Sequence, residues 1–289
     1  MEDLATVHHP VTDLFQVPSI EEGFNHYAIS GQDVDNFKTK GYLAGVKVLD
    51  DHQIEVLKTA LEEFLQPDYQ PNPLFYEFHS NEASDPNLVL FHALGAWRVS
   101  PPLHDILWNP GILKPASQLL DDQPVRFWHD QLFCKPALHG GVVAWHQDYS
   151  YWTRTKPMQH LTCWIGLDDA DRDNGCMYYV PESHRWGLLD KPELAGDMDG
   201  IMRYLDDEQK KQFQPIPIEL KKGYATFHHP LLLHGSYANN TNRPRRAIVL
   251  NYFVDGTRSD SDEALLDGTE TIKKGKKMSG KFFPLLYNP

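Results

Sequence analysis

The feature that most constrains the fold is a change of hydrophobic period near residue 122. Beyond it, apolar segments of strand length follow one another at 125–135, 142–148, 161–167, 176–180, 216–220, 224–228 and 246–254. Turn signals such as Asp173-Asn174-Gly175 separate them. Short strands at regular intervals with turns between them are typical of a β-sandwich or a jelly roll. The pattern therefore predicts a mostly β core over residues 123–255.

The residues before this core have a mainly helical pattern. One helix is predicted from an N-cap at Asp50 to Pro67, with apolar residues at helical spacing. Another is predicted over 105–120, broken at Pro110 and Pro115. A chain of 289 residues fits one large domain. We expect a single domain, 1–289, with five parts: a surface arm at 1–30, a mainly helical flank at 31–122, the core at 123–255 with an insertion or lid at 188–214, and a tail at 256–289.

Composition excludes some classes of partner. The formal net charge of −13 disfavours a nucleic-acid groove or an anionic membrane surface.

The start of the chain lacks the basic and apolar regions of a signal peptide, and no apolar run has the length of a membrane helix. Three cysteines, Cys134, Cys163 and Cys176, lie in apolar runs without paired zinc spacing. We read them as buried reduced thiols of a cytoplasmic protein.

The segment Trp145-His146-Gln147-Asp148 carries the first chemical signal. If it is an extended strand, His146 and Asp148 leave the same face. Two His and one carboxylate form the facial site that holds Fe(II) in oxygenases and leaves coordination positions open. His146 and Asp148 would supply two of these three ligands.

The third ligand must come from elsewhere among fifteen histidines, most of which we expect to be surface or hydrogen-bonded residues. His234 differs by its context, His234-Gly235-Ser236, with Arg245 eleven residues later at the mouth of an apolar strand. A buried Arg needs an anion, and a carboxylate matches its fork. A structural ion pair is the plainer interpretation. Neighbouring Arg246 is the rival anchor: strand alternation sends the two side chains to opposite faces, and spacing alone does not choose between them.

Taken together, the His-x-Asp motif, the distant His-Gly-Ser and the following Arg resemble the phytanoyl-CoA dioxygenase family of Fe(II)/2-oxoglutarate oxygenases. Trp164, sixteen residues after Asp148, and the Asp173-Asn174-Gly175-Cys176 turn also fit. The segment 180–184 is similar to the family's Pro-Gly-Ser-His segment, with Glu182 in place of the usual glycine. The resemblance covers about residues 33–255.

The resemblance implies a double-stranded β-helix (jelly-roll) core with flanking N-terminal helices. It also implies that iron is held by His146, Asp148 and His234, and that 2-oxoglutarate is bound by Arg245, Ser236, Trp164 and Gln131. A lysine that some members place upstream is missing, since Val89-Leu90-Phe91 stands near that position. The presence of Asp148 disfavours a halogenase, in which that ligand position is free for chloride.

The implied activity is oxidation of an unactivated C–H bond of a small organic metabolite, with O2 as oxidant and decarboxylation of 2-oxoglutarate to succinate and CO2. Tyr149, Tyr151 and Trp152 follow the metal motif and are candidates for the wall of a substrate pocket, with core packing as the alternative. Two other functions remain open: a cupin-type metalloenzyme that does not use 2-oxoglutarate, and a non-catalytic jelly-roll binding module. Neither the substrate nor the oligomeric state follows from the sequence.

Overall fold

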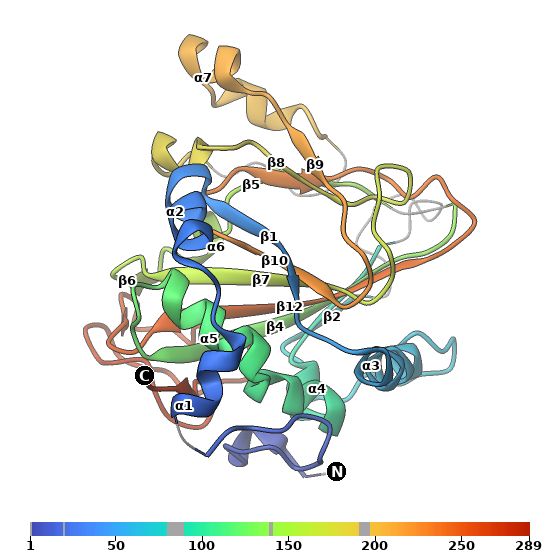
Figure 1. Cartoon of the computed structure of the whole chain (residues 1–289), viewed down its shortest axis with the longest axis vertical. Helices are drawn as coiled ribbons and strands as arrows, with labels where there is room; N and C mark the ends of the chain where they lie inside the picture. Colours follow the sequence, from blue (N-terminus) through green and yellow to red (C-terminus); the bar gives the residue numbers. More distant parts are fainter. Residues whose placement is uncertain (1, 20, 80–89, 139–140, 191–196) are drawn as a thin grey trace.

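Two antiparallel sheets lie face to face in the computed structural model, which describes residues 2–19, 21–79, 90–138, 141–190 and 197–289 (Figure 1). The larger sheet has the order β1 (Tyr42–Lys47), β10 (Tyr224–His228), β7 (His160–Gly166), β12 (Arg245–Val254), β4 (Val125–Lys135), β3 (Phe91–Leu94), β2 (Glu77–His79), and β14 (Leu285–Tyr287) also pairs with β4. The smaller sheet has the order β5 (Val143–His146), β11 (His234–Ser236), β8 (Met177–Tyr179), β9 (Ile216–Ile218). A third, two-stranded sheet pairs β13 (Arg258–Ser259) with β6 (Thr155–Lys156).

Alternation along β12 separates the two faces of the larger sheet. Ala247 and Val249 pack with Trp164 and with residues of the smaller sheet, so their face is directed between the sheets. Ile248 and Leu250 belong to the main core, which the helices share. Because side chains alternate along a strand, every second residue of β12, β7 and β4 faces the space between the sheets.

Helices cover the outer face of the larger sheet (Figure 1). They are α1 (Glu21–Phe24), α2 (Gly31–Lys40), α3 (Asp51–Phe64), α4 (Pro101–Asp105) and α5 (Pro110–Leu119), with 3-10 turns η1 (Leu4–Thr6), η2 (Asn25–Tyr27), η3 (Ala96–Arg98) and η4 (Ile106–Trp108). Asp50 caps α3, as predicted, by accepting a hydrogen bond from the backbone N–H of Gln53. The prediction of a mostly β chain with N-terminal flanking helices is confirmed.

One helix boundary differs from the prediction. Pro110 starts α5 in the first helical position, where its missing N–H costs nothing. The helix then continues through Pro115 to Leu119 instead of breaking there. Leu113 and Ala116 are fully buried in the core, and their burial outweighs the hydrogen bond that Pro115 cannot donate.

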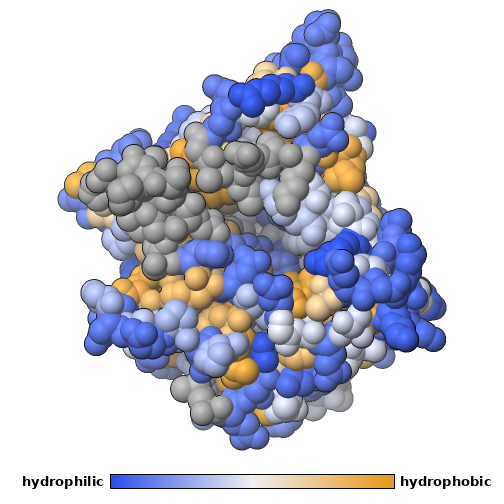
Figure 2. All heavy atoms as spheres, turned by 180° about the vertical axis from the view of Figure 1, so that it is seen from behind, coloured by the Kyte–Doolittle hydropathy of each residue, from blue (hydrophilic) through white to orange (hydrophobic). Residues whose placement is uncertain are grey.

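Residues 200–213 pack on the outer face of the smaller sheet. The segment contains η6 (Gly200–Arg203) and α7 (Asp207–Gln212). Ile201 joins a buried cluster with Trp145 of β5 and Leu233, on the side of the sheet opposite to the larger one. In Figure 1, α7 forms the projecting end of the molecule, and Figure 2 shows that this end is hydrophilic. No described helix has the length and apolar character of a membrane span.

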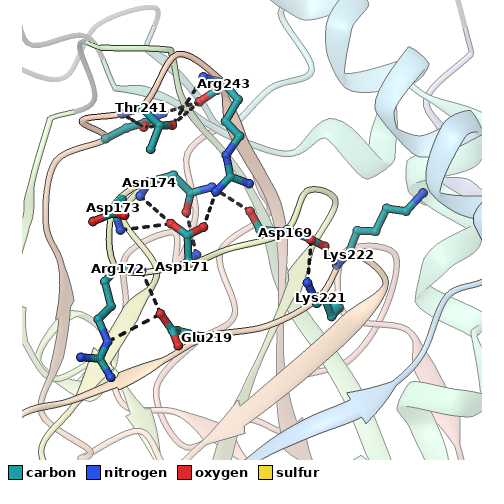
Figure 3. A network of polar contacts seen from close by, with 11 residues as sticks. Asp169, Asp171, Arg172, Asp173, Asn174, Glu219, Lys221, Lys222, Thr241 and Arg243 are labelled. Atoms are coloured by element: carbon teal, nitrogen blue, oxygen red, sulfur yellow. Dashed lines mark hydrogen bonds and ion pairs between the residues drawn. The ribbon is translucent and has the colours of Figure 1, made fainter.

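A surface network fixes the end of the molecule where β12 begins (Figure 3). Asp171 accepts hydrogen bonds from the backbone N–H groups of Asp173 and Asn174, both at 3.0 Å, and forms an ion pair with Arg243. The predicted turn is present, with Gly175 at φ 84°. Since Arg243 lies two residues before β12, this network holds the entry of that strand in place.

Candidate metal centre

The two candidate histidines face each other across the smaller sheet. His146 is the last residue of β5, His234 is the first of β11, and the two are register partners. Partners in an antiparallel pair project to the same face. Asp148 follows two residues after β5 ends, with helical backbone angles of φ −56° and ψ −42°, and precedes the short helix α6 (Tyr149–Trp152). The prediction that 142–148 is extended throughout is therefore wrong: a helical turn brings Asp148 beside His146.

Both imidazole rings are oriented by backbone carbonyls. The Nδ1 of His146 donates to the oxygen of Ala144 at 2.8 Å, and the Nδ1 of His234 donates to that of Leu232 at 2.9 Å. This tautomer leaves each Nε2 with a free lone pair. Each Nε2 lies 3.6 Å from Oδ1 of Asp148, and one ligand atom of each of the three residues lies within 4.8 Å of the others.

Burial and mutual charge set the protonation states. Desolvation holds the pKa of His234 well below its usual value, so the ring is neutral. Desolvation raises the pKa of Asp148, but the neighbouring His234, His146 and His228 outweigh it and hold that pKa well below the usual range. Neutral imidazole and ionised carboxylate are the forms that bind a metal. The donor set is that of a facial 2-His-1-carboxylate site and fits Fe(II).

Arg245 lies at the start of β12, buried to 2% exposure. Its guanidinium carbon is 5.5 Å from the ring centre of Trp164. The Nε has no hydrogen-bond partner, and the described residues provide the guanidinium with no ion pair. Burial lowers the pKa of Arg245 to about 10, which leaves it charged at neutral pH. A buried cation without an anion is costly, so this site is suited to a carboxylate ligand.

The neighbouring Arg246 is engaged differently. Its Nε and Nη2 each donate to Asp168 at 2.8 Å, and its Nη1 pairs with Glu62. These contacts satisfy the fork of Arg246 with carboxylates of the protein itself. Of the two rival arginines, only Arg245 has a guanidinium available to a ligand.

A buried lysine that sequence analysis missed lies next to Arg245. Lys135 is the register partner of Arg245, and its Nζ donates to the carbonyl oxygens of Ser236, at 3.2 Å, and Tyr237. Burial and the charge of Arg245 hold the pKa of Lys135 well below its usual value. Ser236 itself is buried on β11, two residues after His234. Arg245 and Lys135 therefore lie next to β11, the strand that carries His234.

Gln131 of β4 and Trp164 of β7 lie on either side of β12 and project to the same face of the sheet, since both are register partners of Val249. Gln131 shares a hydrogen bond of 3.0 Å with His92 Nε2. His92 therefore lies on this face beside Gln131. Of the segment considered there, Val89 lies outside the described residues.

The three aromatic residues after the motif separate into two groups. The Tyr151 ring lies 6.1 Å from that of His146. Tyr149 and Trp152 are buried in the main core, where the Tyr149 hydroxyl donates to the carbonyl of Thr155 at 2.7 Å. Only Tyr151 contacts a ligand candidate with its ring.

Other residues around the centre gave no signal in the sequence. Thr162 and His228 hydrogen-bond the second oxygen of Asp148. The buried Gln147 amide donates to the carbonyls of Gly187 and Leu231 and so fixes the peptide between the two ligands. Nearby, Glu182 takes a left-handed conformation with φ 67°, which explains why a glycine suits that position in similar sequences.

Comparisons with known proteins agree with this arrangement. The family model described as "Phytanoyl-CoA dioxygenase (PhyH)" matches residues 37–247. A probable phytanoyl-CoA dioxygenase of Caenorhabditis elegans is 29% identical over 54% of this chain and 52% of its own length. A phytanoyl-CoA dioxygenase of Arabidopsis thaliana is 27% identical over 77% of this chain and 88% of its own. The match thus spans about half of the nematode relative.

Among solved structures, the epimerase SnoN in complex with Fe3+, alpha-ketoglutarate and nogalamycin RO superposes with a TM-score of 0.71. The two chains are 22% identical, and the match covers 89% of this chain and 98% of SnoN. At this identity the likeness shows the fold, a double-stranded β-helix. With the family model matching well over half of the residues, the chain belongs to the phytanoyl-CoA dioxygenase family.

Proposed function

We propose that the protein is an Fe(II)/2-oxoglutarate-dependent dioxygenase that oxidises an unactivated C–H bond of a small organic molecule. In the hydroxylation form of the reaction, substrate, O2 and 2-oxoglutarate give hydroxylated substrate, succinate and CO2. The observation that carries the proposal is the buried guanidinium of Arg245, which has no anion among the described residues, on the sheet that faces the one carrying His146 and His234. A metal site alone would not require this cation.

The residues of the chain have separate roles in this proposal. His146, Asp148 and His234 would hold the iron through the two Nε2 atoms and Oδ1, a facial donor set of the kind that leaves coordination positions for other ligands. Arg245 binds the distal carboxylate of 2-oxoglutarate, with Trp164 beneath the guanidinium. Ser236 and Gln131 complete the cosubstrate site. Iron with 2-oxoglutarate supplies the oxidising chemistry, and the protein supplies orientation and exclusion of water.

On the substrate side, Tyr151 is the aromatic residue that best fits a pocket wall, because it flanks His146. We propose a small metabolite as substrate. The three cysteines are buried and unpaired, in keeping with a reducing compartment, and we propose the cytoplasm as the location.

The test is an anaerobic titration of the apoprotein with Fe(II) and then with 2-oxoglutarate, followed by visible absorption. A metal-to-ligand charge-transfer band that needs both additions, and that is absent in His234→Ala, is the expected result. Iron binding without a band would favour a cupin-type metalloenzyme in which Arg245 is structural. No iron binding at all would favour a binding module.

A further inference from the structure

The two oxygens of the Asp148 carboxylate have different surroundings. Oδ1 lies 3.6 Å from Nε2 of both His146 and His234. Oδ2 is turned away from these atoms and receives hydrogen bonds from the Thr162 hydroxyl at 2.6 Å and from Nε2 of His228 at 3.0 Å. Oδ1 is therefore placed to bind a metal, and Oδ2 is hydrogen-bonded to the protein.

The two donors to Oδ2 come from adjacent strands. His228 of β10 and Thr162 of β7 are register partners in the larger sheet. Their side chains project together toward the smaller sheet, where Asp148 lies. Asp148 thus bridges the two sheets, and the rigid larger sheet sets the angle of its carboxylate.

A third residue fixes the ring of His228. The Tyr179 hydroxyl lies 3.0 Å from His228 Nδ1, and both side chains are almost completely buried. Because the ionised Asp148 can only accept, Nε2 of His228 donates to Oδ2. The Tyr179 hydroxyl also donates to Thr226 Oγ1 at 3.2 Å, and the Thr226 hydroxyl donates to the Leu43 carbonyl at 3.0 Å. The contact of Nδ1 with the buried Tyr179 hydroxyl therefore fixes the His228 ring with its Nε2 directed at Asp148.

His228 lies close to the three ligand candidates, but its Nε2 is not among the ligand atoms that converge. Its ring centre is 4.4 Å from that of His234, but its Nε2 is directed at Oδ2, and the ligand atoms that converge belong to His146, Asp148 and His234. A second oxygen on the metal would occupy one of the positions that a facial site leaves open. The hydrogen bonds to Oδ2 oppose that outcome.

We propose that His228, oriented by Tyr179, is a positioning residue that keeps Asp148 bound to the metal through one oxygen only and so keeps a coordination position free for cosubstrate and O2. This inference rests on the proposed function. Outer partners of metal ligands commonly change metal affinity by about 10- to 100-fold when removed. Since Thr162 remains on Oδ2 when His228 is lost, we expect an effect at the low end, about tenfold.

The test compares four variants with the wild-type full chain by anaerobic Co(II) titration and by the visible band of the Fe(II)–2-oxoglutarate complex. His228→Leu is expected to bind Co(II) about tenfold more weakly, because the Asp148 carboxylate is held less firmly. It is also expected to shift the band, because one of the two hydrogen bonds that oppose a second metal–oxygen contact is lost. His228→Gln retains an N–H donor and is expected to restore both properties. Tyr179→Phe is expected to fall between them.

His229→Leu is the matched control. This neighbouring histidine packs on His184, with ring centres 5.2 Å apart, and accepts from the Leu231 N–H, so its loss leaves Asp148 untouched. A wild type without a band would refute the proposed function and not this inference. Wild-type Co(II) affinity and band in His228→Leu would overturn the inference, as would complete loss of metal binding, which would make His228 a ligand. If that variant does not fold, a wild-type affinity and band in Tyr179→Phe overturns it equally.

Discussion

Replacing Arg245 by Met separates cosubstrate binding from folding. The guanidinium is 2% exposed and has no carboxylate among the described residues. A bound carboxylate would receive two hydrogen bonds from a charged donor, each worth about 1.5–3 kcal/mol. Losing the pair costs ~3 kcal/mol at the least, and at 1.36 kcal/mol per factor of ten this is about 100-fold in 2-oxoglutarate affinity.

The same substitution has the opposite effect on the protein without cosubstrate. Exchanging an unpaired buried charge for an apolar side chain of similar volume is neutral or stabilising. We therefore expect Arg245→Met to keep or raise the melting temperature without 2-oxoglutarate, and to abolish the increase that 2-oxoglutarate produces in the wild type.

Arg246→Met is the control, since that guanidinium pairs with Asp168 and Glu62. It should lower the melting temperature and leave 2-oxoglutarate affinity within a few-fold. Affinity is measured from the charge-transfer band at increasing 2-oxoglutarate under argon, and stability by thermal unfolding. Arg245 is not the carboxylate anchor if Arg246→Met weakens 2-oxoglutarate binding more than Arg245→Met does. Strong destabilisation of the cosubstrate-free protein by Arg245→Met would show that the guanidinium is instead paired within the protein.

Three further predictions follow from other contacts. Asp148→Ala should remain folded by circular dichroism and lose succinate production by more than about 100-fold. That is the largest effect commonly seen when a residue that only hydrogen-bonds a metal ligand is removed. Normal succinate production would exclude Asp148 as a ligand. Burial raises the pKa of Asp3, but the hydrogen bond from Arg98 and further contacts outweigh it and lower the pKa to about 2. The stabilisation from Asp3 is thus complete above its unfolded pKa of about 4 and is lost as pH falls toward 2, so urea unfolding of Asp3→Asn and wild type should converge in acid. Glu182→Gly should raise the unfolding free energy by about 0.5–1 kcal/mol in urea titrations, since Glu182 has φ 67°; a loss of stability would show that its side chain contributes more than the backbone conformation costs.

The β core could be predicted from sequence because its signal is local. A period-2 pattern and turn residues identify strands without knowledge of their partners. The outcome at Pro115 shows the limit, since the helix continues through a residue that locally breaks helices. Only the burial of neighbouring side chains in the assembled core decides that balance.

The position of Asp148 shows a second limit. The spacing of two residues suggested strand alternation, yet the strand ends at His146 and a helical turn follows. The four residues 149–152, three of them aromatic, are too few to distinguish a strand from a helix by their period. The motif was still informative, since either geometry can bring an imidazole and a carboxylate together.

The residues that hydrogen-bond Asp148 could not be identified from the local sequence. His228 is one histidine among fifteen, and nothing in its neighbours distinguishes it from His229. Its role follows from register: β10 places it beside Thr162, while β8 places Tyr179 opposite His234. Metal ligands can be recognised by residue type and spacing, whereas the residues that orient them are selected by strand pairing across the whole core, and so they become visible only when the fold is known.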